Sequence, residues 1–469
     1  MANDHSRRKF IKKLGGSTLF AIAAPTIIAE AANVKDKGVQ ILKRRSKVPA
    51  NDRINIASIG LGIMGFGNLK AALSREGIEL VSGADCYDGH LQRLKELYGT
   101  DIKTTRNYEE ILEDPTIDGV IISTPDHWHA RQAIAAMKKG KAVYCEKPMV
   151  KKIEEGDEII STQKASKLAF QVGSQWASSI VIQKAKELYE TGAIGQLNFV
   201  EVYTDRFDAK GAWQYSIPPD ASAQTCDWKS FQGGVTNLPF DSTRFFRWRN
   251  YQDYGTGMAG DLFVHLFTRL HTITSSFGPE RIYATGGLNY WKDGRDVADL
   301  MLGLFDYPKT DKHPAFNLSL RVNFVDGSGG GDSMRLVGNE GEMVLNGNSV
   351  TIRNKKLPLA PGYGGWDTFG TFPENTQNEF VKAYNEKYKE VKPQVLPVGE
   401  LVFQAPTGYD MRVDHFDNWF NAIRTNGVAN EGPEFAMRTT GPALAANLSY
   451  QEKNIIHWDP VKIRRKQSS

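Results

Sequence analysis

Asp261 and His265 are four residues apart in a short apolar segment at 260–265. If this segment is helical, the carboxylate and the imidazole project from one face and can share a proton-transfer task. His265 would take the proton of an alcohol, and Asp261 would orient or hydrogen-bond the reacting group. The spacing also fits a helix cap with a buried structural histidine. It fits a pair of metal ligands as well, but no third ligand follows nearby, so we expect no metal.

Lys147 is the middle residue of a Glu-Lys-Pro motif that follows an apolar run at 141–145. The run predicts a buried strand, and the carboxyl ends of parallel strands face the ligand crevice of an open α/β sheet. A lysine amine at this edge could polarise or deprotonate a substrate hydroxyl. A solvent-exposed lysine in a loop would show the same sequence pattern. The sequence position alone therefore fits both a catalytic lysine and a loop lysine.

A glycine pattern near the start of the chain predicts a dinucleotide-binding turn. A buried strand runs into Gly60-x-Gly62-x-x-Gly65, and a second strand at 78–84 ends at Asp85. Gly60 suits the turn, Gly62 leaves room for a pyrophosphate, and Gly65 allows close packing of the next helix. Asp85 would bind the adenosine ribose, and no Arg or Lys follows it directly. The pattern therefore favours NAD over NADP.

These residues require a parallel sheet to position them, and the N-terminal half alternates predicted strands and helices as such a sheet does. We expect an α/β protein with an N-terminal, doubly wound Rossmann sheet. The expected strands after Asp85 lie at 102–105, 118–125, 141–145 and 168–172, and the helices at 88–98, 108–113, 130–139 and 153–166.

Long extended runs with few helices dominate the chain beyond residue 178, which predicts a C-terminal α/β domain with a large, mostly antiparallel sheet. Its expected strands lie at 197–204, 281–290, 298–305, 316–325, 333–337, 342–345 and 349–353, and its helices at 178–189, 374–389, 409–424 and 442–453. Residues 206–255 form a long excursion rich in aromatic side chains.

The first 31 residues resemble a twin-arginine export signal. Arg7 and Arg8 precede a modest apolar run and a small-residue cleavage site at 29–31. A disordered basic tail is the alternative interpretation. Export to the periplasm by the twin-arginine route would separate the protein from the cytoplasmic NAD pool, so we expect a tightly held cofactor that is recycled within the site.

The expected domain organisation follows from these boundaries. The expected segments are an export signal at 1–31, a linker at 32–52, the NAD-binding domain at 53–173, a substrate and oligomerisation domain at 174–458 and a tail at 459–469.

Composition excludes several functional classes. Of the formal net charge of +4, residues 1–31 contribute +3, and the remaining +1 argues against a nucleic-acid partner. The apolar run after the paired arginines is too short and too polar to predict a membrane span in the mature chain. The 3 cysteines have neither a disulfide framework nor metal-ligand spacing.

Taken in order, the motifs resemble the Gfo/Idh/MocA family of oxidoreductases over about residues 53–458. They are Gly60-x-Gly62-x-x-Gly65, Asp85, Thr124-Pro125-Asp126-His127-Trp128-His129, Glu146-Lys147-Pro148 and Asp261-x-x-x-His265. The resemblance implies NAD as cofactor, a ring alcohol of a sugar or cyclitol as substrate, and a homodimer or homotetramer formed through the C-terminal sheet. It also implies Lys147 and His265 as catalytic residues supported by Asp261, with a cis peptide before Pro148.

We expect the cofactor to lie on the glycine turn and on the ends of the strands that follow. The expected contacts are Gly60, Gly62, Ile63, Met64, Gly65, Asp85, Ser123, Thr124, Pro125, His129, Glu146 and Lys147. The expected substrate contacts are Trp128, Gln175, Trp176, Arg247 and Trp248, with His127 and Arg249 as further candidates. Similar members frequently carry Arg at the position of Trp176, so its indole favours neutral sugar rings over acidic ones.

Three functions fit these residues. The first is an NAD-dependent oxidoreductase acting on a sugar, glycoside or cyclitol. The second is a glycoside hydrolase or lyase that oxidises a ring hydroxyl transiently, eliminates the glycosidic group and shows no net redox change. The third is a binding or sensing protein that keeps the fold, against which the presence of Lys147, Asp261 and His265 speaks.

Overall fold

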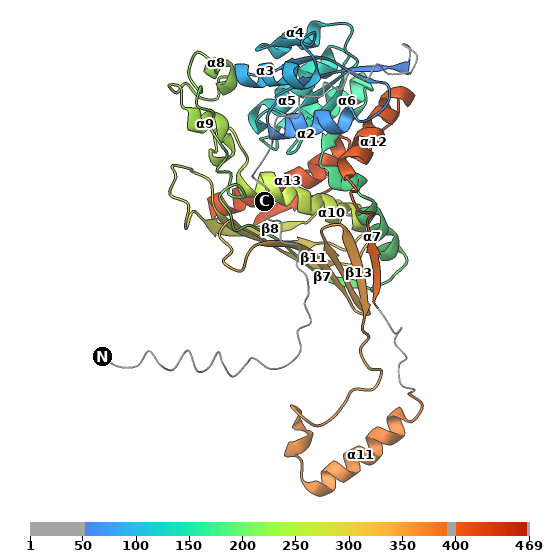
Figure 1. Cartoon of the computed structure of the whole chain (residues 1–469). Helices are drawn as coiled ribbons and strands as arrows, with labels where there is room; N and C mark the ends of the chain where they lie inside the picture. Colours follow the sequence, from blue (N-terminus) through green and yellow to red (C-terminus); the bar gives the residue numbers. More distant parts are fainter. Residues whose placement is uncertain (1–51, 392–399, 467–469) are drawn as a thin grey trace, which may run out of the picture. The chain divides into compact units, whose positions relative to one another are not determined.

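The computed structural model describes residues 52–391 and 400–466 (Figure 1). The expected export signal and residues 32–51 of the expected linker lie outside this part of the chain. Within it, the secondary structure forms two sheets, one of six strands and one of ten.

The first sheet has the strand order β3-β2-β1-β4-β5-β6, with every neighbouring pair parallel, which confirms the predicted doubly wound sheet. Its strands are β1 (Ile54–Ile59), β2 (Ile78–Ala84), β3 (Lys103–Thr105), β4 (Gly119–Ile122), β5 (Ala142–Glu146) and β6 (Phe170–Gly173). Its helices are α2 (Ile63–Ala72), α3 (Asp88–Tyr98), α4 (Tyr108–Glu113), α5 (Asp126–Lys138) and α6 (Glu155–Ser166). Strands β4 and β5 are buried throughout, as a parallel sheet covered on both faces requires.

The second sheet has the order β14-β13-β12-β11-β7-β10-β9-β8-β15-β16. Only β7 and β10 pair in parallel among these strands of the described chain, so the predicted antiparallel character is confirmed. The strands are β7 (Leu197–Asp205), β8 (Arg281–Gly287), β9 (Leu300–Tyr307), β10 (Phe316–Asn323), β11 (Gly331–Gly338), β12 (Gly341–Asn346), β13 (Ser349–Asn354), β14 (Leu401–Gln404), β15 (Ile456–Asp459) and β16 (Arg464–Arg465).

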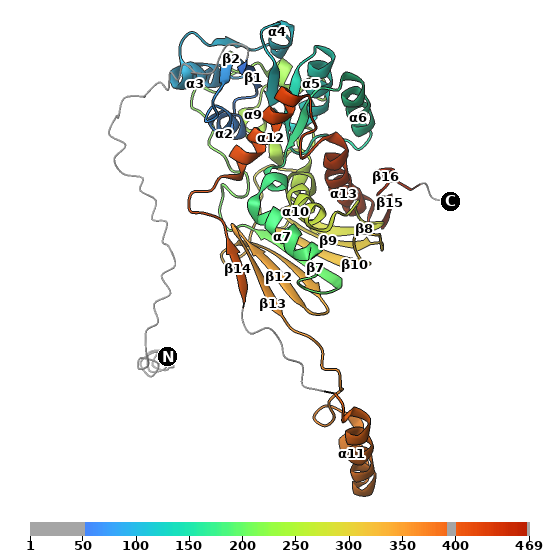
Figure 2. The same cartoon turned by 90° about the vertical axis from the view of Figure 1, so that its right-hand side faces the viewer.

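Helices cover one face of this second sheet. They are α7 (Ile180–Glu190), α10 (Val264–Thr274) and α13 (Pro433–Glu452), which Figure 2 shows on the same side of the strands. Side chains alternate between buried and exposed along β8, β9 and β10, so the other face is open. Three neighbouring apolar side chains are exposed on that open face: Tyr283, Leu302 and Leu304.

The C-terminal helices also complete the first sheet. The aromatic face of α12 (Met411–Thr425) packs on Tyr144 of β5, with the rings of Tyr144 and Phe416 stacked 4.4 Å apart. Trp419 and Phe420 of the same helix are fully buried there. The Rossmann core therefore includes a helix that the chain adds more than two hundred residues after β6.

Several elements differ from the expectations. Helix α13 begins at Pro433, nine residues before the predicted start, and continues through Pro442. Strands β14, β15 and β16 were not predicted, because segments of two to four residues are too short to show a period. Helix α11 (Glu374–Tyr388) was predicted and is present, but none of its residues is buried.

The excursion at 206–255 carries the short helices α8 (Trp228–Gln232), α9 (Ser242–Phe246) and η3 (Trp248–Asn250). It is attached to the Rossmann domain directly after β2. Asp88 N donates to Thr225 O over 3.0 Å, and Asp227 N donates to Cys86 O over 2.7 Å. Figure 1 shows α8 beside α3 accordingly. The excursion thus reaches from the second sheet to the edge of the first.

No helix among the described residues is both long and apolar enough to cross a membrane.

Candidate active site

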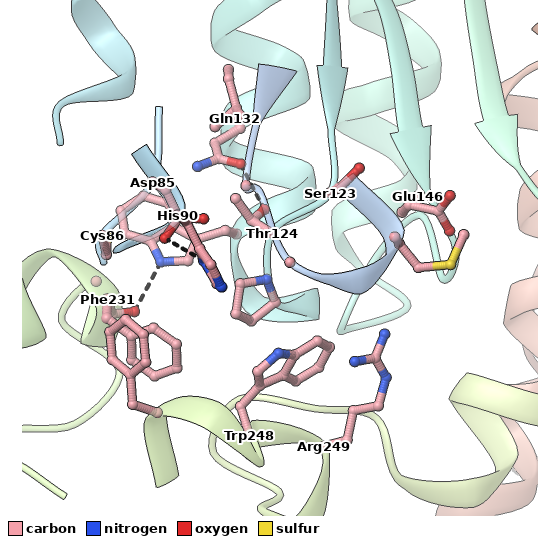
Figure 3. A pocket seen from close by; sticks show the side chains of 18 of the residues that line it. Asp85, Cys86, His90, Ser123, Thr124, Gln132, Glu146, Phe231, Trp248 and Arg249 are labelled. Atoms are coloured by element: carbon pink, nitrogen blue, oxygen red, sulfur yellow. Dashed lines mark hydrogen bonds and ion pairs between the residues drawn. The ribbon is translucent and has the colours of Figure 1, made fainter. Parts of the chain in front are cut away.

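A cavity of about 1340 Å³ lies between the carboxyl ends of the Rossmann strands and the excursion (Figure 3). This volume exceeds that of a typical small-molecule site, roughly 300–1,000 Å³, so it has room for a dinucleotide and a second ligand. The expected residues that line it are Gly60, Gly62, Ile63, Met64, Asp85, Ser123, Thr124, Pro125, Trp128, Glu146, Lys147, Gln175, Trp176, Trp248, Asp261 and His265.

The three glycines of the turn meet three different steric conditions. Gly60 has a φ of +88°, and a Cβ there would lie 2.7 Å from the carbonyl carbon of Ser123. A Cβ on Gly65 would lie 2.2 Å from Gly60 O, so α2 can approach the turn only with glycine at this position. A Cβ on Gly62 would meet no atom within 4 Å. The open space above Gly62 is the space that a pyrophosphate would use.

Asp85 is held in place at the end of β2. Its Oδ2 accepts a hydrogen bond from Leu61 N over 2.7 Å, and its Oδ1 accepts one from Tyr87 N over 2.8 Å. His90 Nδ1 lies 3.2 Å from Oδ1 (Figure 3). Burial disfavours the charged imidazole, but the negative charge of Asp85 outweighs burial and raises the pKa of His90. The carboxylate is thus fixed at the position where a ribose would bind it, and His90 is a neighbour that the sequence did not reveal.

Lys147 and Asp261 form a buried ion pair between the two sheets. A cis peptide bond joins Lys147 to Pro148, which confirms that expectation. Its Nζ donates to Asp261 Oδ1 over 2.7 Å and to Asp261 O over 2.9 Å. Burial alone would raise the pKa of Asp261, but the charges of Lys147 and Arg249 hold that pKa well below its usual range. Asp261 is therefore a carboxylate that orients the lysine amine.

The segment that carries Asp261 and His265 is helical, but it is not a regular α-helix throughout. Residues Ala259–Phe263 form a π-helical turn, and α10 begins only at Val264. Such turns are rare and are frequent at functional sites. The start of this helical segment is fixed by Asp126, whose Oδ2 accepts hydrogen bonds from Thr256 N over 3.0 Å and from Thr256 Oγ1 over 2.7 Å. Asp126, on α5, thus ties the Rossmann domain to the helix that carries Asp261.

His265 presents a ring nitrogen without a partner. Its Nδ1 is buried and has no hydrogen bond within the described chain. Burial and then the positive charge of Lys147 lower the pKa of His265 well below its usual value. The imidazole is therefore neutral at neutral pH and can accept a proton from a ligand in the cavity.

A network of amides joins the strand ends behind Lys147. Glu146 Oε1 accepts hydrogen bonds from Asn68 Nδ2 over 2.9 Å and from Gln175 Nε2 over 3.3 Å. Asn68 Nδ2 also lies 3.2 Å from Ser123 Oγ. Burial raises the pKa of Glu146. Asn68, on α2, was not predicted, and it connects the ends of β4 and β5.

Four expected contacts do not line the cavity. Gly65 packs α2 against the turn. His129 is buried, with Nδ1 2.7 Å from Pro148 O and Nε2 2.8 Å from Thr124 O, so it braces the strand ends. Arg247 donates from Nε to Tyr215 O over 2.7 Å and thereby supports the excursion. His127 has a similar role, because its Nε2 lies 2.8 Å from Phe231 O.

Several side chains that do line the cavity come from the second domain. Arg249 Nε lies 3.4 Å from Asp261 Oδ1, and its guanidinium stacks 4.2 Å from the Trp248 ring. Both side chains rise from the excursion toward the glycine turn in Figure 3. Arg206, Trp213 and Tyr215 line the cavity as well. The aromatic tract around Trp248 was visible in the sequence, whereas nothing there distinguished Arg206.

Metal-ligating side chains do not gather anywhere in the described residues: no three of His, Cys, Asp and Glu lie close enough to hold an ion.

Residues 54–174 match the family model described as oxidoreductase family, NAD-binding Rossmann fold. The match covers β1 to β6, and therefore the glycine turn, Asp85 and Lys147. Residues 54–174 are thus similar to the NAD-binding domain of Gfo/Idh/MocA oxidoreductases, and the cofactor of this domain is NAD.

Curated relatives resemble a part of the chain. A levoglucosan dehydrogenase of Pseudarthrobacter phenanthrenivorans is 27% identical over 195 residues, which are 39% of this chain and 42% of the relative. A glycosyl hydrolase family 109 protein of Shewanella baltica is 32% identical over 174 residues, 34% of this chain and 37% of the relative. An inositol 2-dehydrogenase of Salmonella typhimurium is 27% identical over 34% of this chain and 48% of the relative. The chain thus spans less than half the length of these relatives.

Solved structures share the fold over most of the chain. A levoglucosan dehydrogenase in complex with NADH and levoglucosan has a TM-score of 0.58 and 18% identity, and the match covers 86% of this chain and 99% of the other. The WlbA dehydrogenase from Bordetella pertussis, in complex with NADH and UDP-GlcNAcA, has a TM-score of 0.61 and 15% identity over 87% and 99% of the chains. The arrangement of Rossmann sheet and large second sheet is therefore that of these dehydrogenases.

Proposed function

We propose that this protein is an NAD-dependent oxidoreductase that acts on a ring hydroxyl of a sugar, glycoside or cyclitol. One observation carries the proposal. The Lys147–Asp261 pair and His265 line the same cavity as the glycine turn, although they come from distant parts of the chain. Relatives of the N-terminal domain include levoglucosan and inositol dehydrogenases, which support a carbohydrate or cyclitol substrate.

The residues of the cavity suit this chemistry. NAD would be held by the glycine turn and by Asp85, and when bound it supplies a nicotinamide ring that exchanges a hydride with a carbon atom. Lys147 donates a hydrogen bond to the reacting oxygen while Asp261 keeps the amine in position. His265, neutral at neutral pH, takes the hydroxyl proton on its imidazole ring.

The structure favours retention of the cofactor between turnovers. The excursion forms backbone hydrogen bonds with Cys86 and Asp88, which directly follow the ribose-binding position. This segment also lines the cavity that would hold the dinucleotide. Retention suits a protein that works outside the cytoplasm, and we propose export through the twin-arginine signal at 1–31 on the sequence pattern.

The test begins with the nucleotide content of purified full-length protein. We expect denaturation to release NAD or NADH in an amount close to one per chain. Addition of polyols and glycosides to protein at high concentration should then produce the absorbance of reduced nicotinamide. Protein that contains no nucleotide, binds none and responds to no member of a broad panel would contradict the proposal.

A second candidate is a glycoside hydrolase or lyase that uses NAD transiently. The glycosyl hydrolase family 109 relative favours it. In this case an aromatic glycoside would release its aglycone without added NAD and without net reduction of the cofactor. Deuterium from the solvent would enter the product next to the oxidised carbon. Aglycone release together with deuterium exchange selects this candidate, and accumulation of reduced nicotinamide selects the first.

We also propose that the chain forms homo-oligomers through the open face of the ten-stranded sheet. The exposed fractions of Tyr283, Leu302 and Leu304 are 42%, 40% and 57%. These side chains are neighbours on β8 and β9 and form an apolar patch that a second copy would cover.

A further inference from the structure

The end of the cavity next to His265 carries more positive than negative side chains. Lys147, Arg206 and Arg249 line it, and Asp261 is the carboxylate that lies among them. The charges of Arg206, Lys147 and Asp261 all act on His265, which places these groups in one cluster. Two further carboxyl groups lie near this cluster. That of Glu146 is turned to the amides of Asn68 and Gln175, and that of Asp126 accepts hydrogen bonds from Thr256. Burial raises the pKa of both and so disfavours their charged forms. The cluster therefore keeps an excess of positive charge.

The two arginines retain free hydrogen-bond donors. A guanidinium group has five N–H donors in a fixed plane, which is the geometry that matches a carboxylate. Arg206 donates from Nη1 to Gly211 O over 2.6 Å and stacks on Phe324, and within the described chain it has no carboxylate partner. Arg249 has one long contact of 3.4 Å from Nε to Asp261. Most of their N–H groups are thus available to a ligand.

Aromatic side chains surround these donors. Trp176, Trp213, Tyr215 and Trp248 line the same cavity, and flat aromatic faces are suitable surfaces for the C–H faces of a sugar ring. Tyr215 lies near Arg249, Asp261 and Arg206, since the charges of all three act on its hydroxyl. The cavity therefore combines a surface for a sugar ring with donors for an anion.

From this arrangement we infer that the substrate is an anionic sugar, whose carboxylate binds between Arg206 and Arg249 while its ring lies on the aromatic side chains. The inference rests on the proposed oxidoreductase function and names the substrate class of the same site. It reverses the sequence-based expectation of a neutral ring. That expectation considered only the position of Trp176, where similar members frequently carry an arginine. In this chain, Arg206 and Arg249 supply the positive charge from other positions.

The test compares matched ligands that differ in one group. Methyl β-D-glucopyranoside, the corresponding methyl glucuronide and the 6-sulfate of the glucoside share the ring and the anomeric group. We expect the glucuronide to have a kcat/KM at least roughly tenfold above that of the neutral glycoside. In calorimetric titration of NADH-loaded protein, where no turnover occurs, the glucuronide should likewise bind more tightly than the neutral glycoside. The sulfate distinguishes a general anion site, which would accept it equally, from one that fits a planar carboxylate.

Variants connect the preference to the arginines. Arg206→Gln should remove most of the preference for the glucuronide, with a smaller effect on the neutral glycoside, and Arg249→Gln should act in the same direction. Arg244→Gln is the matched control, because Arg244 lies on the same excursion, pairs with Asp253 and does not line the cavity. Thermal unfolding and bound nucleotide verify that each variant is folded.

The outcomes separate the two proposals. A preference for the neutral glycoside, or a preference for the glucuronide that survives both arginine substitutions, overturns the inference and leaves the oxidoreductase function intact. Absence of binding and of nicotinamide reduction with every member of a wide panel overturns the proposed function itself.

Discussion

Asp261 makes two kinds of contact with one amine, through its carboxylate and through its backbone carbonyl. The first contact depends on the side chain, and the second depends on the π-helical turn. Lys147 is thus oriented by both a charge and a local backbone conformation. This double support explains why the Lys147 side chain faces a cavity although only 9% of it is exposed.

Replacement of Lys147 tests its role directly. We expect Lys147→Met to lower kcat by about 100-fold or more, since positioned acid–base groups contribute that much. Nucleotide content should stay near the wild-type level, because the turn and Asp85 are unchanged. Steady-state kinetics and nucleotide quantification check both parts. Lys151→Met is the control, since Lys151 donates to Asp253 O outside the cavity. Equal kcat in the Lys147 variant and the wild type would exclude an acid–base role.

The pH dependence follows from His265. The imidazole accepts a proton only when it is neutral, so oxidation slows as the pH falls through the pKa of His265. Burial and the charge of Lys147 lower that pKa, so the acid limb of kcat/KM should lie well below the ordinary value of about 6.5. An acid limb at pH 6.5 or above would contradict this assignment. An NMR titration of the His265 ring should show a higher pKa in Lys147→Met.

At the scale of elements, the glycine turn offers a pair of substitutions with opposite effects. Gly62→Ala should leave the free energy of unfolding within about 1 kcal/mol of the wild type, because its Cβ meets open space. It should weaken NAD binding strongly, because the methyl group occupies the space for the pyrophosphate.

Gly65→Ala is the counterpart. Its Cβ would overlap Gly60 O, so we expect a loss of about 1–3 kcal/mol of stability. Denaturant unfolding and nucleotide titration distinguish the two variants. If Gly62→Ala binds NAD as tightly as the wild type, the assigned path of the pyrophosphate is wrong.

The sequence predicted elements where a periodic pattern was long and local. The parallel sheet, most helices and the antiparallel sheet follow from such patterns, and α4 was predicted with its observed bounds. The start of α13 was missed because Pro442 suggests a beginning, whereas tertiary packing carries the helix through it. The π-helical turn was missed because it inserts into a pattern that reads as an ordinary helix.

The site was predictable to the extent that motifs mark it. Gly62, Asp85, Lys147 and His265 lie in recognisable patterns, and all of them line the cavity. Asn68 and Arg206 lie in no pattern, because their positions depend on packing between elements far apart in the chain. Likewise, His129 looked like a contact residue, but its two hydrogen bonds to backbone carbonyls are visible only in the fold.

At the scale of the whole molecule, the proposed interface on the open face of the second sheet can be tested by substitution. A variant that disrupts this interface should have a lower oligomer mass in solution. Leu304→Lys should shift the oligomer toward the monomer, because a charge at the centre of the patch opposes burial against a second copy. Light scattering or sedimentation measures the mass. Val428→Lys is the control, since Val428 is 91% exposed in the loop after α12. An unchanged oligomer in the Leu304 variant would place the interface elsewhere.

The excursion connects nucleotide exchange to the wall of the cavity that faces the substrate. The segment that bonds to Cys86 and Asp88 also carries Trp248 and Arg249, so opening it to exchange nucleotide would dismantle the wall that faces the substrate. We expect protein that has been stripped of nucleotide and resupplied to show a lag before steady turnover, with a duration independent of nucleotide concentration at saturation. Such a lag would mean that each chain binds its nucleotide once and keeps it through many turnovers.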